Sequence, residues 1–383
     1  MTRVYEEGAE VNTQISKVMR AARLHEAGTP LVVEEVDVPI PRDEDILVRV
    51  RSCGVVPNLA NVLTIWPKVL PNYPLPPLPA IFGLDPAGEV VRVGAHVTGL
   101  SVGDRVYVNP MRVCNTCRHC ANADYAACAY YTFNGYFGFS PKSKTIFERY
   151  PSGGFAEFMC APAYAAVKIP DTMSFDEAAR LGYVGTAYAG LRRAEVGPDT
   201  SVLISGASGT LGVGAVISAL ALGAKRILGV ARNRELLEQV KRIAPHRIEV
   251  RSTEDGAIDE WVRAHVGEEG VDVAIDCLPT GAPYQQFLAG LALVRRGGAL
   301  AIVGGVIDEV PIRISDLMTK GIVLIGSTWF DPKHAREMVA LAGSGVLDFS
   351  VFEHEGYGLD QCNEALSGMS ARRGGFSNYV IHP

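Results

Sequence analysis

Apolar and polar side chains alternate with a period of two in several short runs near the start of the chain. Within residues 45–55, Ile46 and Val48 fall on one face, and shorter runs at 88–94 and 104–108 are separated by glycine turns. Successive side chains of a β-strand point to opposite faces, so this pattern predicts short strands. Residues 70–79 are dense in proline, which predicts an irregular but ordered loop.

The pattern changes near Pro170, where the period becomes helical. Asp171 and Ser174 precede a helical run at 175–181, in the position of N-capping residues. From Ser201 onward, apolar strand-like runs alternate with helical ones. The expected strands are 201–205, 226–231, 271–277, 298–304 and 322–327, and the helices between them include 211–222 and 234–243. Buried strands joined by crossover helices predict a parallel, doubly wound α/β sheet.

Two further helical runs, 332–342 and 360–369, and a last strand at 378–382 follow this sheet. We expect these three elements to return to the first domain. The predicted organisation is therefore an N-terminal extension over 1–18, a β-rich domain made of 19–170 and 329–383, and an α/β domain over 171–328 inserted between them.

The composition is that of a globular protein with room for two cores. The chain has 383 residues, of which 48% are hydrophobic and 20% charged, with a net charge of -6. This mildly acidic balance predicts neither nucleic acid nor an anionic membrane as a partner. The polar first 18 residues match no signal or transit peptide, and the glycine-broken apolar run 211–224 is shorter than the roughly 18 residues of a membrane span. With eight cysteines, these features predict a soluble cytoplasmic protein.

Four cysteines lie close together with a spacing typical of a metal site. Two residues separate Cys114 from Cys117 and Cys117 from Cys120, and Cys128 follows after seven more. Two-residue gaps let neighbouring thiolates turn onto one ion, and four sulfurs complete the tetrahedral shell of Zn²⁺. A closed shell leaves no position for substrate, so the pattern predicts one structural zinc in a lobe over about residues 110–130. A disulfide pair or uncoordinated thiols are the alternatives.

The strand at 201–205 runs directly into a glycine-rich turn that opens an apolar helix. The residues of this turn are Gly206, Ser208, Gly209, Thr210, Leu211 and Gly212. Glycines permit a tight turn and the close approach of a pyrophosphate, and a helix N-terminus supplies positive potential. The position between a strand and a helix, with further βα units behind it, favours a dinucleotide site over an ordinary strand–helix turn.

The residues after the next strand discriminate between the two nicotinamide dinucleotides. An acidic residue about 20 positions after the turn would bind the ribose 2′-hydroxyl of NAD. Strand 226–231 is followed instead by Arg232, Asn233 and Arg234, with no carboxylate before Glu235. A guanidinium pairs well with phosphate, so we expect NADP(H), with Arg232 at the 2′-phosphate. The alternatives are NAD as the cofactor, and arginines that are simply solvated at the start of a helix.

These features together resemble the medium-chain dehydrogenase/reductase superfamily, in particular its zinc-type alcohol dehydrogenases. The resemblance runs from about residue 19 to residue 383. It rests on Gly88, Gly94, Val97, the run Gly103-Asp104-Arg105-Val106, the four cysteines, the runs 153–157 and 185–188, and the glycine turn. It implies a GroES-like catalytic domain made of both ends of the chain, a Rossmann domain inserted between them, and an active site in the cleft between the two.

The resemblance also implies contacts with the cofactor and with a second subunit. Thr186 matches a position near the nicotinamide, although it would otherwise be a helix-start threonine satisfied by the backbone. The strand-end residues Cys277 and Gly304 are further expected contacts of the cofactor. The segment 321–327 matches the edge strand through which the Rossmann domains of the family pair. A homodimer is therefore expected, with a homotetramer as the alternative.

The chain departs from this family at the catalytic zinc. The first ligand of the family is present as Cys53, but its histidine ligand falls on Leu84 and its third ligand, a cysteine, on Tyr183. The hydroxyl that usually relays a proton falls on Asn58. A catalytic zinc needs three protein ligands and an open position, which Cys53 and Asp85 alone do not supply. We therefore expect the catalytic zinc to be absent.

Loss of this metal changes the chemistry that the chain is expected to perform. Alcohol oxidation would lose the ion that lowers the pKa of the alcohol, whereas hydride addition from NADPH to an enone, a quinone or a similar acceptor needs only donors for the developing charge. Tyr183 and Asn58 are the expected catalytic residues, because by resemblance both face the cleft. The alternative is that both merely fill the space of the missing zinc.

The run 130–139 is unusually rich in aromatic side chains and glycine, and Trp66 is expected near the same pocket. Such a wall suits an aromatic or apolar small-molecule substrate, or else it covers the cysteine lobe. The sequence thus predicts an NADPH-dependent oxidoreductase without catalytic zinc. The alternatives are an alcohol dehydrogenase with unconventional proton transfer and a non-catalytic NADPH-binding protein. The intact glycine turn, Arg232 and Thr186 argue against the last of these.

Overall fold

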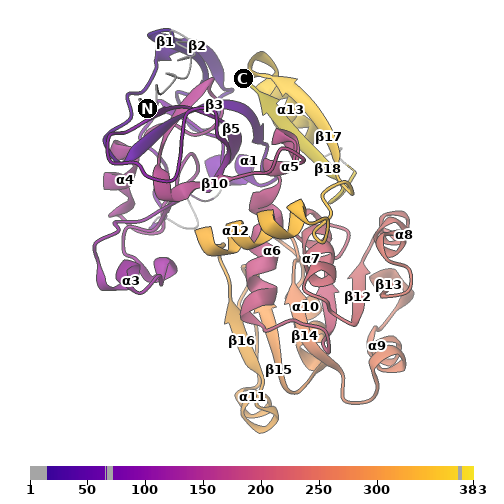
Figure 1. The fold of residues 1–383 in the computed structure, drawn as a ribbon. Helices are drawn as coiled ribbons and strands as arrows, with labels where there is room; N and C mark the ends of the chain where they lie inside the picture. Colours follow the sequence, from indigo (N-terminus) through magenta and orange to yellow (C-terminus); the bar gives the residue numbers. More distant parts are fainter. Residues whose placement is uncertain (1–14, 65, 67–71, 370–372) are drawn as a thin grey trace, which may run out of the picture.

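The computed structural model describes residues 15–64, 66, 72–369 and 373–383. Residues 1–14 of the predicted extension and residues 70 and 71 of the predicted proline-rich loop therefore lie outside the described part. Figure 1 shows two bodies side by side, one rich in β-strands and the other built of strands alternating with helices. The fold is α/β, with a GroES-like part and a Rossmann-like part, as the sequence predicted.

The β-rich body is organised around a seven-stranded sheet. Its strand order is β10-β6-β5-β3-β18-β17, with β9 paired to β3 as well. These strands are β3 (Asp45–Gly54), β5 (Asp85–Val93), β6 (Arg105–Val108), β9 (Phe158–Pro162), β10 (Ala166–Lys168), β17 (Glu353–Gly358) and β18 (Ser377–His382). A smaller sheet of order β2-β1-β4 adds β1 (Val18–Leu24), β2 (Val32–Asp37) and β4 (Ala80–Ile81). The strands predicted at 45–55, 88–94 and 104–108 are present as β3, β5 and β6.

The second body contains a six-stranded sheet in which all neighbouring strands are parallel. Its order is β13-β12-β11-β14-β15-β16. The strands are β11 (Ser201–Ser205), β12 (Arg226–Ala231), β13 (Ile248–Ser252), β14 (Val271–Asp276), β15 (Val294–Ile302) and β16 (Val323–Gly326). In order of sequence this is the 3-2-1-4-5-6 arrangement of a dinucleotide-binding fold, in which successive strands are added on one side of β11 up to β13 and on its other side from β14 onward.

Helices cover the faces of this sheet and their sequences explain their limits. The helices are α7 (Thr210–Ala221), α8 (Arg234–Ile243), α9 (Asp259–Val266), α10 (Tyr284–Ala292) and α11 (Ile314–Lys320). Asn233 caps α8 by accepting a hydrogen bond from the backbone N–H of Leu236. The helix predicted at 175–181 is shorter, α5 (Phe175–Ala178), and begins at a capping box between Ser174 and Glu177.

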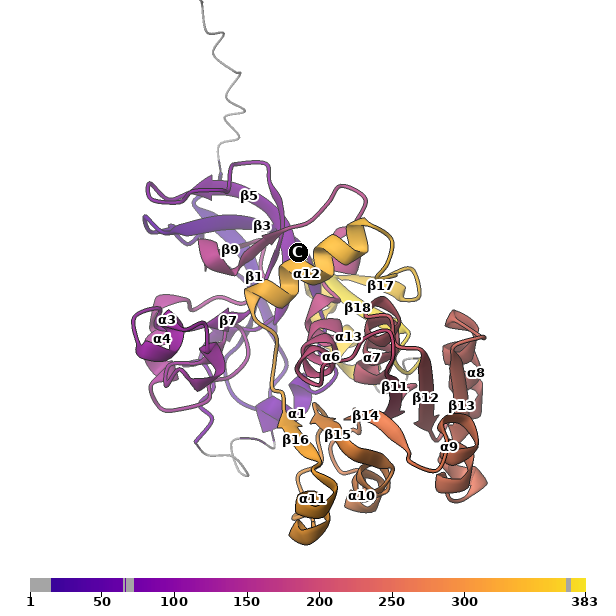
Figure 2. The ribbon, with the colours of Figure 1, turned by 60° about the horizontal axis from the view of Figure 1, so that its bottom comes forward.

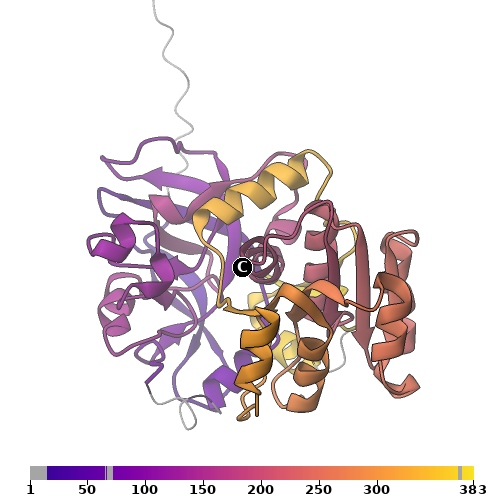
Figure 3. The same cartoon turned by 90° about the horizontal axis from the view of Figure 1, so that it is seen from below.

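Several elements connect the two bodies. Helix α6 (Leu181–Arg193) packs on α7, and α12 (Pro332–Gly343) contacts both α6 and β10 of the first body. Figures 2 and 3 show α12 lying between the two bodies in both views. Beyond it come β17, α13 (Cys362–Gly368) and β18, and β18 pairs antiparallel with β3 in the register Ile381 to Cys53. Strand β18 thus lies beside Cys53, which matches the first zinc ligand of the family.

Two differences between the predicted and the observed strands have physical reasons. Strand β15 begins at Val294, four residues before the predicted start at 298. The prediction began too late because Arg296 and Gly297, near the start of the strand, are exposed and interrupt the apolar run. Strand β13 was missed altogether, since it lies at the edge of its sheet and its central residues are only half-buried. No helix within the described ranges is long and apolar enough to cross a membrane.

Candidate functional site

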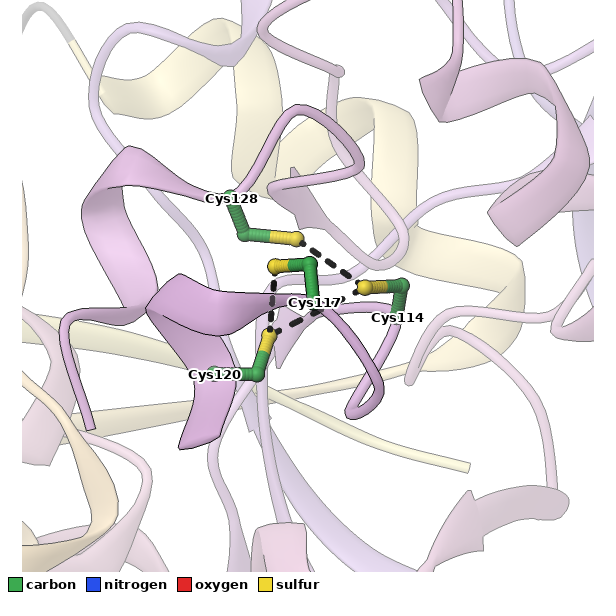
Figure 4. A group of neighbouring side chains, drawn as sticks. All are labelled: Cys114, Cys117, Cys120 and Cys128. Atoms are coloured by element: carbon green, nitrogen blue, oxygen red, sulfur yellow. Dashed lines mark hydrogen bonds between the residues drawn. The ribbon is translucent and has the colours of Figure 1, made fainter. Parts of the chain in front are cut away.

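The four cysteines of the predicted metal site converge on one point of the lobe (Figure 4). The Sγ atoms of Cys117 and Cys120 are 3.6 Å apart, those of Cys114 and Cys120 3.9 Å, and those of Cys128 and Cys114 3.6 Å. A tetrahedral zinc with bonds of 2.3 Å to sulfur requires sulfur–sulfur edges of about 3.8 Å. All four sulfurs lie within 4.8 Å of one another, so donor type and spacing both fit a closed zinc shell.

The local backbone turns these sulfurs inward. Cys117 precedes the short helix α3 (Arg118–Ala121), and Asn115 adopts a left-handed conformation with φ of 59°. Burial raises the pKa of the Cys114 thiol, but hydrogen bonds from Thr116 and Cys117 outweigh it and lower that pKa to about 6. The thiolate that a metal needs is therefore favoured at Cys114. His119, in the same helix, contacts Asp124 at 3.2 Å instead of joining the sulfurs.

Cys53, Leu84 and Asp85 mark the place where the resemblance would put a catalytic zinc. Cys53 is fully buried in β3, and Leu84 is 3% exposed. Asp85, 1% exposed, accepts a hydrogen bond of 2.7 Å from the hydroxyl of Tyr107. Burial raises the pKa of the Asp85 carboxyl to about 7, against the lowering effect of Tyr107 and Arg180. Its carboxylate lies against the backbone of Gly182, where a Cβ atom would overlap both carboxylate oxygens.

The cysteine tetrad is the only set of three or more His, Cys, Asp or Glu side chains in the described part of the chain that lies close enough to share a metal. Cys53 and Asp85 are therefore not joined by a third such side chain among those residues. The close approach of Asp85 to Gly182 was not predicted from the sequence. Gly182 near the start of α6 is the one local feature that could have indicated this contact, because helices seldom carry glycine without a packing reason.

The two predicted catalytic residues lie together. Asn58 precedes α1 (Leu59–Thr64), and its Oδ1 accepts a hydrogen bond of 3.2 Å from the hydroxyl of Tyr183 in α6. The hydroxyl of Tyr136 donates to the same Oδ1 atom. Asn58 and Tyr183 are half-buried, whereas Tyr136 is 4% exposed. Tyr136 follows β8 (Thr132–Phe133) in the aromatic run, and its role was missed because that run predicted only an apolar wall.

The aromatic run forms a packed cluster around these polar groups. The rings of Phe137 and Trp66 are 4.5 Å apart, and those of Phe137 and Tyr136 5.0 Å. Phe133 and Phe137 are buried, while Trp66 is half-buried. Edge-to-face and tilted ring contacts of this kind stabilise the cluster internally. Most of the run therefore serves as packing, while Trp66 as a whole is only half-buried.

The glycine turn has the shape that a pyrophosphate requires. Gly206 has φ of 81°, and a Cβ atom there would lie 2.8 Å from the carbonyl oxygen of Cys277. At Gly212 a Cβ atom would lie 2.7 Å from backbone atoms of Ala207. Gly209 caps α7, and a Cβ atom there would meet nothing closer than 3.3 Å. The turn is tight on its inner side and leads into the N-terminus of α7, whose positive potential favours an anion.

The remaining predicted cofactor residues surround this edge of the sheet. Ser208 and Thr210 are buried in the turn, while Leu211 is half-buried. Cys277, 5% exposed, follows β14, and Gly304 follows β15, where a Cβ atom would lie 2.8 Å from the backbone of Leu278. The hydroxyl of Thr186 donates a hydrogen bond of 2.9 Å to the carbonyl oxygen of Gly182 one turn earlier in α6. The helix thus satisfies the Thr186 hydroxyl proton, which leaves only its oxygen lone pairs for a ligand.

An unpredicted carboxyl group stands at the same edge. Asp276 ends β14, is 2% exposed, and accepts a hydrogen bond of 3.1 Å from Leu278 through Oδ1. Its Oδ2 atom has no hydrogen-bond partner among the described residues. Burial raises the pKa of this carboxyl to about 6. Asp276 was not predicted as a site residue, because it lies at the end of the apolar run that predicts β14.

The two arginines after β12 differ in their surroundings. Arg234 forms ion pairs with Glu254 at 3.1 Å and Asp255 at 2.5 Å. Arg232 is exposed, and its guanidinium makes no ion pair or hydrogen bond with the described residues. Its carbonyl accepts a hydrogen bond of 2.8 Å from Ser252 at the end of β13, which holds the backbone there. Of the two side chains, Arg232 is the one that is available to a phosphate.

The C-terminal part of the first body reaches the glycine turn. The backbone N–H of Gly375 donates to the carbonyl of Ser208 at 2.8 Å, and Arg180 donates to the carbonyl of Gly375 at 2.7 Å. Arg180 is 4% exposed and its guanidinium stacks on Phe352 at 4.7 Å. This contact ties the first body directly to the turn, and sequence periodicity gives no sign of it.

Comparisons with known proteins agree with this geometry. Residues 42–171 match the alcohol dehydrogenase GroES-like domain, and residues 210–344 match the zinc-binding dehydrogenase family. The chain is 32% identical over 330 residues to an alcohol dehydrogenase of Geobacillus stearothermophilus, covering 85% of this chain and 90% of the relative. It is 31% identical over 319 residues to human quinone oxidoreductase, covering 82% and 81%.

The solved structure of AibC matches with a TM-score of 0.81 and 26% identity over 99% of both chains. Fold, nucleotide turn and relatives together define an oxidoreductase of the nicotinamide-dependent kind. The chain belongs to the medium-chain dehydrogenase/reductase superfamily.

Proposed function

We propose that this protein is an NADPH-dependent reductase that acts without a catalytic zinc on an activated C=C or C=O group, such as that of an enone or a quinone. The observation that carries the proposal is the hydrogen-bonded group of Asn58, Tyr136 and Tyr183, together with Asp85 packed against Gly182. Donors of hydrogen bonds replace a Lewis acid here. The name of the human relative, quinone oxidoreductase, supports the same class of acceptor.

The proposed chemistry divides between cofactor and protein. When bound, the reduced nicotinamide supplies a hydride, with its electron pair, to the acceptor carbon, while a solvent proton completes the reduction. The chain's own residues orient the acceptor and stabilise the negative charge that develops on its oxygen. The start of α7 and the tight turn at Gly206 and Gly212 support binding of the pyrophosphate.

The choice of NADP(H) over NAD rests on Arg232. Its guanidinium is exposed at the end of β12, and no ion pair with a described residue engages it. A phosphate on the ribose would find a partner there, whereas Arg234 is engaged by two carboxylates.

We assign the nucleotide-binding domain to residues 171–328 and the GroES-like domain to 19–170 and 329–383. One structural zinc belongs to the tetrad, where it would hold the lobe and perform no chemistry.

We further propose a homodimer formed through β16. This strand is the outer edge of the parallel sheet, and Val323 within it is 54% exposed. Ile314 and Met318 of the neighbouring helix α11 are 71% and 75% exposed. An apolar edge strand pairs readily with a second copy. Light scattering should give the mass of two chains, and the double change Val323→Lys and Met318→Lys should give one; a wild-type monomer would refute the dimer.

Metal analysis combined with turnover tests the catalytic proposal. We expect one zinc per chain and oxidation of NADPH with 2-cyclohexen-1-one or 1,4-benzoquinone in the presence of a chelator that removes weakly held metal. Two zinc ions per chain, with activity lost on removal of the second, would instead support an alcohol dehydrogenase. Binding of NADPH without turnover across enones, quinones, aldehydes and alcohols would support a non-catalytic protein.

A further inference from the structure

One amide oxygen in the candidate site accepts two hydroxyl groups. Oδ1 of Asn58 receives hydrogen bonds from Tyr136 and from Tyr183, the latter at 3.2 Å. The three residues come from distant segments: the turn before α1, the loop after β8, and α6. An amide carries its acceptor at one end and its two donors at the other. The two hydroxyls therefore fix which end of the Asn58 side chain points toward them.

The donor end of this amide points away from the tyrosines. Nδ2 of Asn58 makes no hydrogen bond with any residue in the described part of the chain, and those residues do not enclose it. The side chain as a whole is half-buried. Two N–H groups are thus held in a fixed direction with no partner from the described residues, which is how a preorganised donor is built.

The tyrosine that is most deeply buried is a poor proton donor to a substrate. Tyr136 is 4% exposed, and burial raises the pKa of its hydroxyl well above 10, with Tyr183 and Asp85 adding to the effect. Its hydroxyl already donates its proton in a hydrogen bond to Oδ1 of Asn58. Tyr136 therefore acts on the site through the orientation of the amide.

We propose that Asn58 is the residue that binds the substrate oxygen, through its Nδ2 group, and that Tyr136 and Tyr183 are positioning residues that hold the amide in place. The inference rests on the proposed reductase function. It assigns the substrate class to compounds with a carbonyl or quinone oxygen, on which negative charge collects as the acceptor carbon is reduced. Tyr183, which the sequence predicts as a catalytic residue, directs its hydroxyl at Asn58.

Double-mutant cycles test these roles with cyclohexenone as the probe. Asn58→Asp keeps an acceptor for both tyrosines but removes the donors, so kcat should fall about 100-fold or more while KM for NADPH stays unchanged. Tyr136→Phe and Tyr183→Phe should each lower kcat in the wild-type background. Neither should lower it further in an Asn58→Ala background, because both act through the amide. A further fall with Tyr183→Phe in that background would make Tyr183 a direct proton donor and overturn the assignment.

The pH profile separates this role from a structural one. In Asn58→Asp, kcat should rise as pH falls from 8 to 5, since a protonated carboxyl regains one donor; a flat profile contradicts the inference. Tyr131→Phe is the matched control, because Tyr131 is buried in the same aromatic run and its hydroxyl donates to none of the described residues. Its kcat and KM should equal those of the wild type, and zinc content should be the same in all variants.

A binding measurement distinguishes failure of the inference from failure of the proposed function. Loss of turnover in the wild type across the acceptor panel would refute the reductase. The absorbance shift of 4-nitrophenolate, titrated into the NADP⁺-loaded protein, then decides the inference alone. Binding that weakens at least 10-fold in both Asn58→Asp and Asn58→Ala supports an oxygen-binding Nδ2 group, because Asn58→Ala removes the donors without adding a negative charge. Equal affinity in the wild type and Asn58→Ala overturns it.

Discussion

Replacing Gly182 by alanine would place a methyl group against the buried carboxylate of Asp85. A Cβ atom at this position overlaps both carboxylate oxygens and would also meet the Cγ atom. The carboxylate has little freedom to withdraw, because Asp85 is 1% exposed and accepts a hydrogen bond of 2.7 Å from Tyr107, which is itself fully buried. Either the start of α6 must move or this hydrogen bond must break.

The expected change in the free energy of unfolding follows from two destabilising contributions and one stabilising contribution. Overpacking of a buried site costs about 1–3 kcal/mol, and breaking a buried hydrogen bond that leaves Tyr107 without its acceptor costs about 1–3 kcal/mol. Alanine in a helix is favoured over glycine by up to about 1 kcal/mol. Because either cost relieves the overlap, Gly182→Ala should lower the free energy of unfolding by about 1–2 kcal/mol. In an Asp85→Ala background the overlap is gone, so the same change should be neutral or stabilising by up to about 1 kcal/mol.

Urea titration followed by circular dichroism measures all four proteins of this cycle. Gly197→Ala serves as the control, because no atom lies within 4 Å of a Cβ there, and it should change stability by less than about 0.5 kcal/mol. Additive effects of Gly182→Ala and Asp85→Ala would refute the argument. They would mean that the carboxylate does not fill the space beside α6.

Three further outcomes are expected. Cys128→Ser should reduce the zinc content of the purified protein from one ion per chain to well below one and make the lobe more sensitive to protease, because three sulfurs leave the tetrahedron open. Burial raises the pKa of Asp85 to about 7, above its value of about 3.9 in the unfolded chain, so the folded protein binds the extra proton and stability should fall as pH rises from about 4 to about 7. Asp85→Asn should remove most of that slope in urea titrations at several pH values. Arg232→Ser should raise KM for NADPH by roughly 10-fold or more and leave KM for NADH nearly unchanged, since a charged hydrogen bond contributes about 1.5–3 kcal/mol.

Each of these has a result that would contradict it. Retention of a full zinc equivalent by Cys128→Ser would show that the tetrad is not the metal site. Stability that rises with pH between 4 and 7, or a slope unchanged in Asp85→Asn, would contradict the protonation argument. Arg234→Ala is the control for Arg232, since Arg234 is engaged by Glu254 and Asp255, and a larger effect there on KM for NADPH would reverse the assignment.

The part of the fold that the sequence predicts is the part that local burial determines. Strands β11 and β12 are almost wholly buried, so their apolar runs end where the strands end. Strand β17 carries the residues Glu-His-Glu-Gly-Tyr-Gly and is mostly exposed, so nothing in its pattern reads as a strand. It exists because β18 supplies a parallel partner, with Glu353 opposite Ser377. Pairing of this kind is tertiary information.

The candidate site divides in the same way. The cysteine tetrad was predictable because metal ligands follow a spacing that is short in sequence. The group of Asn58, Tyr136 and Tyr183 joins residues up to 125 positions apart, so the sequence could suggest its members but not their contact. The resemblance that selected Asn58 and Tyr183 could not select Tyr136, which has no part in the zinc pattern. The approach of Gly375 to Ser208 likewise depends on how the two bodies pack.

The pairing of β18 with β3 has a consequence for the order of events during synthesis. The six strands of the parallel sheet lie between residues 201 and 326, with no strand of another sheet among them. That sheet can assemble while the chain is still emerging from the ribosome. The first sheet cannot be completed until residues 377–382 have been made, although β3 was made more than 300 residues earlier. The end of β3 at Cys53 and Gly54 must therefore wait without its β18 partner, which leaves that edge open to non-native pairing until synthesis ends.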